Sequence, residues 1–142
     1  MLSYKEEELG MIIIYPKMKK AINISNAPDP VGPYSQAVEF NDLLFASGQI
    51  AIDPSNGNLN TESINTELNQ IFKNIDALLK ASKLKRSNIL KCSIFLKNMD
   101  DFEKVNDLYS SFFIKPYPAR ETVQVSKLPK NANIEISFIA GK

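Results

Sequence analysis

Histidine and tryptophan are absent from the 142-residue sequence, and cysteine occurs once, as Cys92. Without histidine, the chain cannot form a Ser-His-Asp or Cys-His nucleophile system, a zinc site of the H-E-x-x-H type or an imidazole proton shuttle. A single cysteine excludes an intrachain disulfide and a four-thiolate metal site. Any catalysis must therefore rest on carboxylates, arginine, lysine, tyrosine, hydroxyls and backbone groups.

The sequence also lacks a large excess of charge. Its 17 Lys and Arg residues against 16 Asp and Glu residues give a net charge of +1, whereas proteins that wrap nucleic acid are strongly basic. Its 5 glycines form no G-x-G-x-x-G or P-loop pattern, so a nucleotide site has no support. A hydrophobic content of 44% is ordinary for a soluble globular protein, and the length favours one domain.

The first 18 residues lack the features of a targeting signal. Three glutamates at positions 6–8 stand where a secretory or mitochondrial signal avoids acids. The apolar run Met11–Tyr15 is too short for a signal-peptide core or a membrane span. We expect a cytoplasmic protein without membrane association, with a flexible extension over residues 1–18 and a single domain over residues 19–142. The sequence leaves open whether the chain instead begins at a later methionine.

Alternation of apolar and polar residues, bounded by turn residues, predicts strands in six segments. These are Lys20–Ser25, Ser35–Phe40, Leu43–Gln49, Ile89–Leu96, Ala119–Ser126 and Asn133–Ala140. Asn41-Asp42 tolerates positive φ and predicts a hairpin between the second and third strands. Within Ile89–Leu96, the alternation places Leu90, Cys92, Ile94 and Leu96 on one face. We therefore expect Cys92 to be a buried, inert thiol and not a redox centre.

Two segments have helical periodicity. Apolar residues recur at three- and four-residue spacing from Ile64, which predicts a helix that ends near Ser82. Asp100-x-x-Glu103 resembles a capping box and predicts the start of a second helix, which Pro116 and Pro118 stop. That second helix carries Phe102, Val105, Tyr109 and Phe112.

The predicted order β-β-β-α-β-α-β-β is typical of an α+β fold, with one mixed six-stranded sheet and two helices on one face. Such an arrangement leaves the second face of the sheet uncovered. Ser35–Phe40 and Leu43–Gln49 are apolar or neutral in part. We expect that face to be buried in an oligomer.

Two charged residues interrupt the last two predicted strands. Arg120 opens a half-apolar strand with Thr122 and Gln124 on the same face, and Glu135 lies in an otherwise apolar run. A charge removed from water is costly unless a partner or a ligand meets it, so the two form a candidate constellation. On periodicity alone, the simpler interpretation is preferred, in which each pairs with a neighbour or points to solvent.

Several motifs occur in order along the chain. They are Gly32-Pro-Tyr-Ser-Gln-Ala37, Ala46-Ser-Gly-Gln-Ile50, Lys104-Val-Asn106, Pro118-Ala-Arg120, and Leu128-Pro-Lys130 followed by Ile134-Glu-Ile136. Together they resemble the RidA/YjgF family of enamine/imine deaminases, which also carries the older name L-PSP endoribonucleases. The resemblance covers Lys20 to Gly141 and implies a chorismate-mutase-like α+β subunit. It also implies a homotrimer with a central β-barrel and three ligand clefts between subunits.

The resemblance implies a role for each matching residue. Arg120 would clamp the substrate carboxylate with its planar fork of donors. Glu135 would hold and polarise the attacking water, and the Tyr34 hydroxyl would lie near the reacting nitrogen or water. Other positions would complete the substrate-binding wall: Ser47, Gly48, Asn106 and the backbone of Thr122, where many bacterial members have cysteine.

The implied reaction hydrolyses short 2-imino acids, such as 2-iminopropanoate and 2-iminobutanoate, to 2-keto acids and ammonia. These reactive intermediates come from pyridoxal-phosphate enzymes, and their removal requires no metal or organic cofactor. Two alternatives remain open: a single-strand endoribonuclease or translation inhibitor, and a non-catalytic binder of a small carboxylate. The basic residues Lys80, Lys83, Lys85, Arg86 and Lys91 could serve RNA. A solvated patch is preferred, because no aromatics are interleaved, and no nucleic-acid partner is expected.

The spacing of Arg120 and Glu135 along the predicted sheet bears on how the site is built. If the last two strands form a hairpin, Arg120 pairs near Ile139 and Glu135 near Gln124. The two charged residues would then lie on the order of 13 Å apart, at ~3.3 Å per residue. An active site that uses both would draw them from two neighbouring subunits. Glu121 departs from the small or apolar residue usual in the family, and would repel an anionic substrate if it bent into the cleft.

Overall fold

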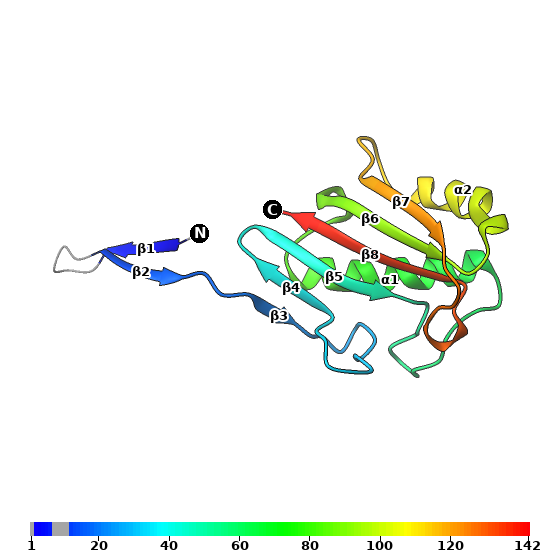
Figure 1. Ribbon diagram of the computed structural model, residues 1–142, viewed down its shortest axis with the longest axis horizontal. Coiled ribbons are helices and arrows are strands. Elements are labelled where there is room, and N and C mark those ends of the chain that lie inside the picture. Colours follow the sequence, from blue (N-terminus) through cyan, green and yellow to red (C-terminus); the bar gives the residue numbers. More distant parts are fainter. Residues whose placement is uncertain (1, 7–11) are drawn as a thin grey trace.

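The computed structural model describes residues 2–6 and 12–142. Strands β1 (Leu2–Glu6) and β2 (Ile12–Pro16) pair antiparallel in a two-stranded sheet that projects from the rest of the chain (Figure 1). The expectation of a flexible extension over residues 1–18 falls partly on residues 1 and 7–11, which lie outside the described residues. It stays a prediction, as does the single domain over residues 19–142.

The other strands form one six-stranded sheet in the order β3-β4-β5-β8-β6-β7 (Figure 1). Their bounds are Lys20–Ile22 for β3, Ala37–Phe40 for β4, Leu43–Gln49 for β5, Ile89–Leu96 for β6, Ala119–Gln124 for β7 and Ile134–Gly141 for β8. Every neighbouring pair is antiparallel except β6 and β7, which are parallel. The mixed sheet and the element order of the domain are therefore as predicted.

The assumed hairpin between the last two strands is wrong. β8 lies between β5 and β6, and β7 pairs with the far side of β6. Arg120 is therefore opposite Cys92, and Glu135 is opposite Phe95, on the two flanks of β6. The parallel pairing follows from the connection, because α2 (Phe102–Phe112) crosses over between β6 and β7.

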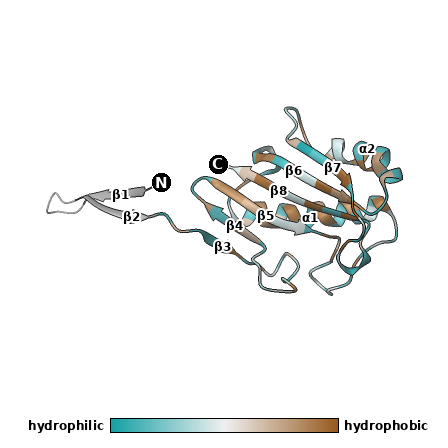
Figure 2. Ribbon diagram, viewed as in Figure 1, coloured by the Kyte–Doolittle hydropathy of each residue, from teal (hydrophilic) through white to brown (hydrophobic). Residues whose placement is uncertain are grey.

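The first helix, α1 (Ile64–Ala81), begins and ends where the periodicity predicts. Ser63 caps its N-terminus by accepting a hydrogen bond from the Thr66 backbone N–H at 3.1 Å, and Ser82 is the C-cap. The apolar stripe of α1 packs against β5 and β8, and long hydrophobic stretches lie along the central strands (Figure 2). The largest fully buried side chains include Leu68, Ile71, Phe72, Ile75, Leu78, Leu79, Ile94, Leu96, Ile134 and Ile136.

Two local predictions are wrong. Asp100 does not cap α2: a 3₁₀ turn over Met99–Asp101 precedes the helix, and the Asn98 side chain accepts from the Asp100 backbone N–H at 3.0 Å. Leu90 does not share the face of Cys92. The ladder of β6 with β8 shifts between Ile89 and Lys91, which turns Leu90 out to 52% exposure and buries Ile89 instead.

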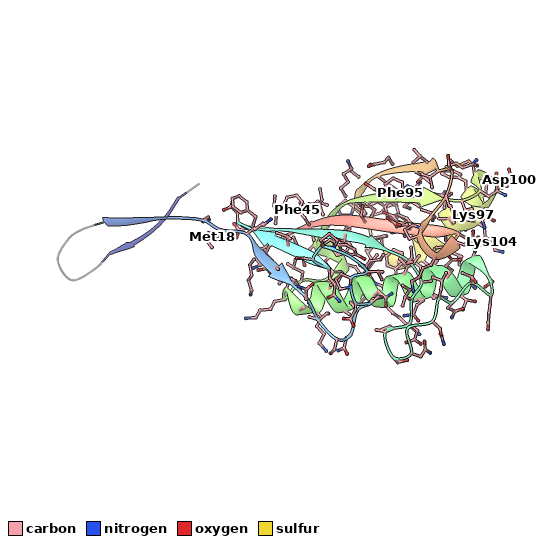
Figure 3. All side chains as sticks on the ribbon, turned by 60° about the horizontal axis from the view of Figure 1, so that its bottom comes forward. Met18, Phe45, Phe95, Lys97, Asp100 and Lys104 are labelled. Atoms are coloured by element: carbon pink, nitrogen blue, oxygen red, sulfur yellow. The ribbon has the colours of Figure 1, made fainter. Side chains whose placement is uncertain are left out.

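The helices cover one face of the sheet and leave the other open. Phe45 and Phe95 point away from α1 on this open face (Figure 3). Large apolar side chains remain exposed there, with Leu43 at 37%, Phe45 at 42% and Val123 at 42%. Among the described residues, no helix is long and apolar enough to cross a membrane.

Candidate functional site

One cavity, of about 390 Å³, lies between α2 and the start of β7. It is lined by Asn106, Tyr109, Ser110, Tyr117, Pro118 and Arg120. Strand alternation turns Arg120 toward α2, where its guanidinium carbon lies 4.9 Å from the Tyr109 ring centroid and 5.9 Å from that of Phe102. Within the described residues, the Arg120 guanidinium forms no ion pair or hydrogen bond. Its donors are therefore free for a ligand.

Two buried hydroxyls lie behind this cavity. Thr122 shares the face of Arg120, and both its Oγ1 atom and the Tyr109 hydroxyl lack hydrogen-bond partners among the described residues. Cys92 is completely buried beside them, as expected, and burial raises the pKa of its thiol to about 11. The thiol therefore stays protonated and is not a nucleophile at neutral pH.

A second cavity, of about 380 Å³, lies at the other end of the sheet. Its lining includes Tyr34, Gln36, Gly48, Gln49, Ile50, Ile52, Lys130 and Glu135. Glu135 is half-buried, and its carboxylate makes no hydrogen bond or ion pair within the described part of the chain. Burial raises the pKa of its carboxyl above the ordinary value. Such a carboxylate can accept a proton from a bound water.

Gly48 makes room for this carboxylate. A Cβ at position 48 would lie 2.6 Å from Cδ and 2.9 Å from Cγ of Glu135. The register of β5 with β8 shifts between Ala46 and Gln49, and Gly48 lies within that irregularity. A side chain at position 48 would therefore displace the Glu135 carboxylate from this position.

Tyr34 stands in the loop that walls the same cavity. Its ring lies 3.7 Å from the point where Gly32 would carry a Cβ, and its hydroxyl accepts a hydrogen bond from the Val31 N–H at 3.2 Å. The side chain is 52% exposed. Ser47 lies next to this wall, but its hydroxyl donates to the Ser35 carbonyl at 2.7 Å and helps to hold the loop.

Sequence reasoning missed the residue that organises this loop. Gln36 is 2% exposed, and its amide nitrogen donates to the carbonyls of Ile24, Ala27 and Pro28 at 3.0, 3.2 and 2.9 Å. Its amide oxygen accepts from the Ile24 N–H at 2.7 Å. Three carbonyls without strand partners are thus satisfied by one buried side chain. The Pro- and Gly-rich composition signals a loop but not the residue that ties it together.

Two polar residues of α1 fix the remaining edges of the second cavity. Asn74 is 1% exposed and donates to the Ile52 carbonyl at 2.9 Å, so it holds the segment after β5. Glu67 is completely buried and accepts from the backbone N–H groups of Asn133 and Ile134 at 2.7 and 3.2 Å. It therefore anchors the start of β8, one residue before Glu135. Their only signal in the sequence is polarity beside a predicted apolar stripe.

The predicted site residues thus fall into two groups. Arg120 and Asn106 line the first cavity, and Thr122 shares the strand face of Arg120. Glu135, Tyr34 and Gly48 line the second cavity, and Ser47 lies beside it. In the ladder, Arg120 and Glu135 are offset by three residues along β6 and lie on its two flanks. This amounts to about 10 Å along the strands and about 10 Å across them. Their side chains also leave opposite faces of the sheet, so one chain does not bring them together.

Local partners satisfy three other charged residues flagged by the sequence: Glu121, Lys91 and Arg86. Glu121 faces away from Arg120: it accepts from the Ser93 hydroxyl at 2.6 Å and pairs with Lys91 at 3.3 Å. The Ser93 hydrogen bond is the main cause of its lowered pKa. Arg86 pairs with Asp76 at 2.7 Å. In the described ranges, no group of three or more His, Cys, Asp or Glu residues could hold a metal ion.

The fold defines the class of protein as an α+β domain whose two helices cover one face of a mixed sheet. The family model described as Endoribonuclease L-PSP matches residues 24–142. The chain belongs to this family, whose solved structures include proteins named RidA and YjgF. The resemblance found in the motifs is therefore confirmed.

Individual relatives carry more specific names. The chain is 43% identical over 121 residues to the 2-iminobutanoate/2-iminopropanoate deaminase of Dermatophagoides farinae, covering 85% of this chain and 94% of that one. Among solved structures, YyfA of Yersinia pestis, of the Rid family, is 45% identical with a TM-score of 0.85, covering 88% and 100% of the two chains. E. coli TdcF with bound serine is 33% identical with a TM-score of 0.82, covering 87% and 98%.

Proposed function

We propose that this protein is an imine/enamine deaminase, a cofactor-independent hydrolase. It converts short 2-imino acids, such as 2-iminopropanoate and 2-iminobutanoate, into 2-keto acids and ammonia. The observation that carries the proposal is a pair of charged side chains without a charged or hydrogen-bonding partner in residues 2–6 and 12–142: Arg120 in one cavity and a desolvated Glu135 in the other. The deaminase name of the 43% identical relative supports the same chemistry.

Arg120 binds the substrate carboxylate. A guanidinium offers two parallel N–H donors to a carboxylate, and no described group competes for them. The cavity around Arg120 adds further hydrogen-bonding groups from Asn106, Ser110 and Tyr117. These residues are suited to the carboxylate end of a small substrate.

Glu135 activates water. The protonated imine carbon is already electrophilic, so the enzyme must mainly orient it and place a water beside it. Glu135 accepts a proton as the water oxygen bonds to the imine carbon, and a carbinolamine forms. It then returns this proton to the amine nitrogen. As the carbon–nitrogen bond breaks, the hydroxyl oxygen forms the carbonyl double bond of the keto acid, and the hydroxyl proton passes through the Glu135 carboxylate to the departing ammonia. The keto acid and ammonium leave, and Glu135 is again a carboxylate.

The complete site forms between two copies of the chain. Arg120 and Glu135 leave opposite faces of one sheet, too far apart to share a substrate of three or four carbons. The open face exposes Leu43, Phe45 and Val123, which are costly to leave in water. A homotrimer with the open faces turned inward, as a central β-barrel, buries them and joins one chain's Arg120 cavity to its neighbour's Glu135 cavity.

The decisive experiment measures turnover directly. 2-Aminoacrylate is generated in situ by a serine dehydratase, and loss of its semicarbazide-trapped product is followed as purified protein is added. We expect the wild type to accelerate that loss, Arg120→Ala to abolish the effect, and the exposed Lys80→Ala to behave as wild type. An unchanged trap signal with wild type, or full activity in Arg120→Ala, contradicts the proposal.

The endoribonuclease in the family description is the second candidate. In its disfavour, Arg86 and Lys91 of the basic group are neutralised by Asp76 and Glu121. The same purified variants are incubated with single-stranded RNA. Cleavage that disappears in Arg120→Ala would support this candidate, whereas cleavage unchanged in all variants indicates contamination.

A further inference from the structure

We propose that Tyr109 is the positioning residue of the Arg120 clamp: the face of its ring holds the guanidinium at the cavity and leaves the N–H donors free for a carboxylate. This role rests on the proposed function, because it explains how the anion clamp of that reaction is oriented. Tyr109 itself does not touch the reacting atoms. It acts through Arg120.

The surroundings of Arg120 are aromatic. Its guanidinium carbon lies 4.9 Å from the Tyr109 centroid and 5.9 Å from the Phe102 centroid, and no described carboxylate or carbonyl binds it. A guanidinium stacks on a ring face through cation–π attraction. A carboxylate partner would also orient Arg120, but it would occupy the N–H donors and neutralise the charge. The rings of Tyr109 and Phe102 orient the side chain while its N–H donors and its charge stay available.

Tyr109 is itself rigidly held. The side chain is 5% exposed, and its ring packs against Phe72 and Phe113 at centroid distances of 6.3 and 4.7 Å. It lies one helical turn after Asn106, which lines the same cavity. The ring is therefore a fixed surface between the core and the clamp. A guanidinium on such a surface loses little freedom when a ligand binds.

The hydroxyl of Tyr109 is not what holds Arg120. It makes no hydrogen bond among the described residues, and burial, with the Cys92 thiol nearby, raises the pKa of Tyr109. The hydroxyl therefore stays protonated. Since the supporting contact is with the ring face, phenylalanine at position 109 keeps it.

If Tyr109 only filled space in the core, the neighbouring ring of Phe113 would have the same role. Phe113 is 8% exposed, contacts Tyr109 and Phe72 in the same cluster, and is not one of the rings over which Arg120 lies. Phe113→Leu thus matches Tyr109→Leu in lost core volume but leaves the clamp untouched. The two variants separate positioning from stability.

The test combines steady-state kinetics on the enzymatically generated imine with calorimetric titration of 2-ketobutyrate, on the full chain. We expect Tyr109→Leu to raise KM and the 2-ketobutyrate Kd roughly tenfold while kcat stays within about twofold. Tyr109→Phe and Phe113→Leu should keep both constants within about twofold of wild type. If Tyr109→Leu does not fold, Tyr109→Met fills most of the same volume without a ring face.

Equal changes in KM and Kd for Tyr109→Leu and Phe113→Leu would overturn the positioning role, as would a Tyr109→Phe variant as weak as Tyr109→Leu. Failure of the proposed function has a different signature: the wild type itself then shows no turnover. An active wild type with an unaffected Tyr109→Leu variant contradicts only the role of Tyr109.

Discussion

The two arginines of this chain lie in similar aromatic surroundings and differ in one respect. Arg86 lies 5.3 Å from the ring centroid of Phe72 and 5.0 Å from that of Phe112. Two of its nitrogens also donate to the Asp76 carboxylate at 2.8 and 2.7 Å, and a third donates to the Phe112 carbonyl at 3.3 Å. Arg120 has two rings of its own but no such partner among the described residues. Arg86 ties α1 to α2, whereas Arg120 is available to a ligand.

Two glutamates, one buried and one half-buried, show the same difference between partnered and unpartnered charges. Glu67 is completely buried and accepts three N–H donors from Asn133 and Ile134. Glu135, which directly follows Ile134 on β8, is half-buried, and its carboxylate has no hydrogen-bond donor among the described residues. Burial raises the pKa of this carboxyl. A charged side chain that has partners within the chain stabilises the fold. A charged side chain without such partners is available to bind a ligand or a water.

The largest expected effect is on the unpartnered carboxylate. Glu135→Gln keeps the shape of the side chain but cannot accept a proton, so kcat should fall by about 100- to 10,000-fold. Because the change also removes a desolvated charge, the free energy of unfolding at pH 7 should rise slightly. Single-turnover kinetics and urea unfolding measure the two. If Glu135→Gln keeps the kcat of wild type and has a lower free energy of unfolding, the proposed difference between Glu135 and Glu67 is wrong.

Arg120→Lys should have the next largest effect. Lysine keeps the charge but loses the planar fork, so kcat/KM should fall about 10- to 100-fold, mainly through KM. The unfolding free energy should stay within about 0.5 kcal/mol of wild type, because the Arg120 side chain has no ion pair or hydrogen bond to lose among the described residues, and lysine keeps its charge beside the rings of Tyr109 and Phe102. Arg120→Lys with an unchanged KM would show that the clamp is not bidentate.

Arg86→Lys is the matched change at the partnered arginine. It removes the two-point pair with Asp76 and part of the stacking on Phe72 and Phe112, so the unfolding free energy should fall by about 1 kcal/mol. The pair is over one-third exposed, which keeps the loss small. Turnover should equal wild type, because Arg86 lines neither cavity. If Arg86→Lys loses turnover while its free energy of unfolding stays at the wild-type value, the assignment of a structural role to Arg86 and a ligand-binding role to Arg120 is wrong.

The sequence predicts the strands and helices well because periodicity reports burial. It fails where a single backbone irregularity decides the outcome. The shift in β6 that exposes Leu90 leaves no mark in an alternating pattern, and Asn98 and Asp100 are equally good caps by composition. Strand order is harder still, since nothing local shows that β8 inserts between β5 and β6.

The candidate site was only partly predictable. Arg120 and Glu135 stand out because charges interrupt apolar strands, and the motifs single out the other predicted residues. The roles of Gln36 and Tyr109 could not be found in this way, because Gln36 falls in a predicted strand and Tyr109 on the apolar face of a predicted helix. Their roles depend on which groups the tertiary structure places beside them.

The smallest expected effect is the pH dependence of the contrast between the glutamates. Burial raises the pKa of Glu135 in the folded chain above its unfolded value, so the folded state binds that proton more tightly. The free energy of unfolding therefore falls as the pH rises from the pKa of Glu135 in the unfolded chain to its pKa in the folded chain. Above the folded pKa, the destabilisation is fully present. Urea unfolding from pH 4 to 8 should show Glu135→Gln gaining on wild type as the pH increases. If the difference in unfolding free energy between Glu135→Gln and wild type stays constant or shrinks with rising pH, the folded chain does not destabilise the Glu135 carboxylate, and the contrast with Glu67 is wrong.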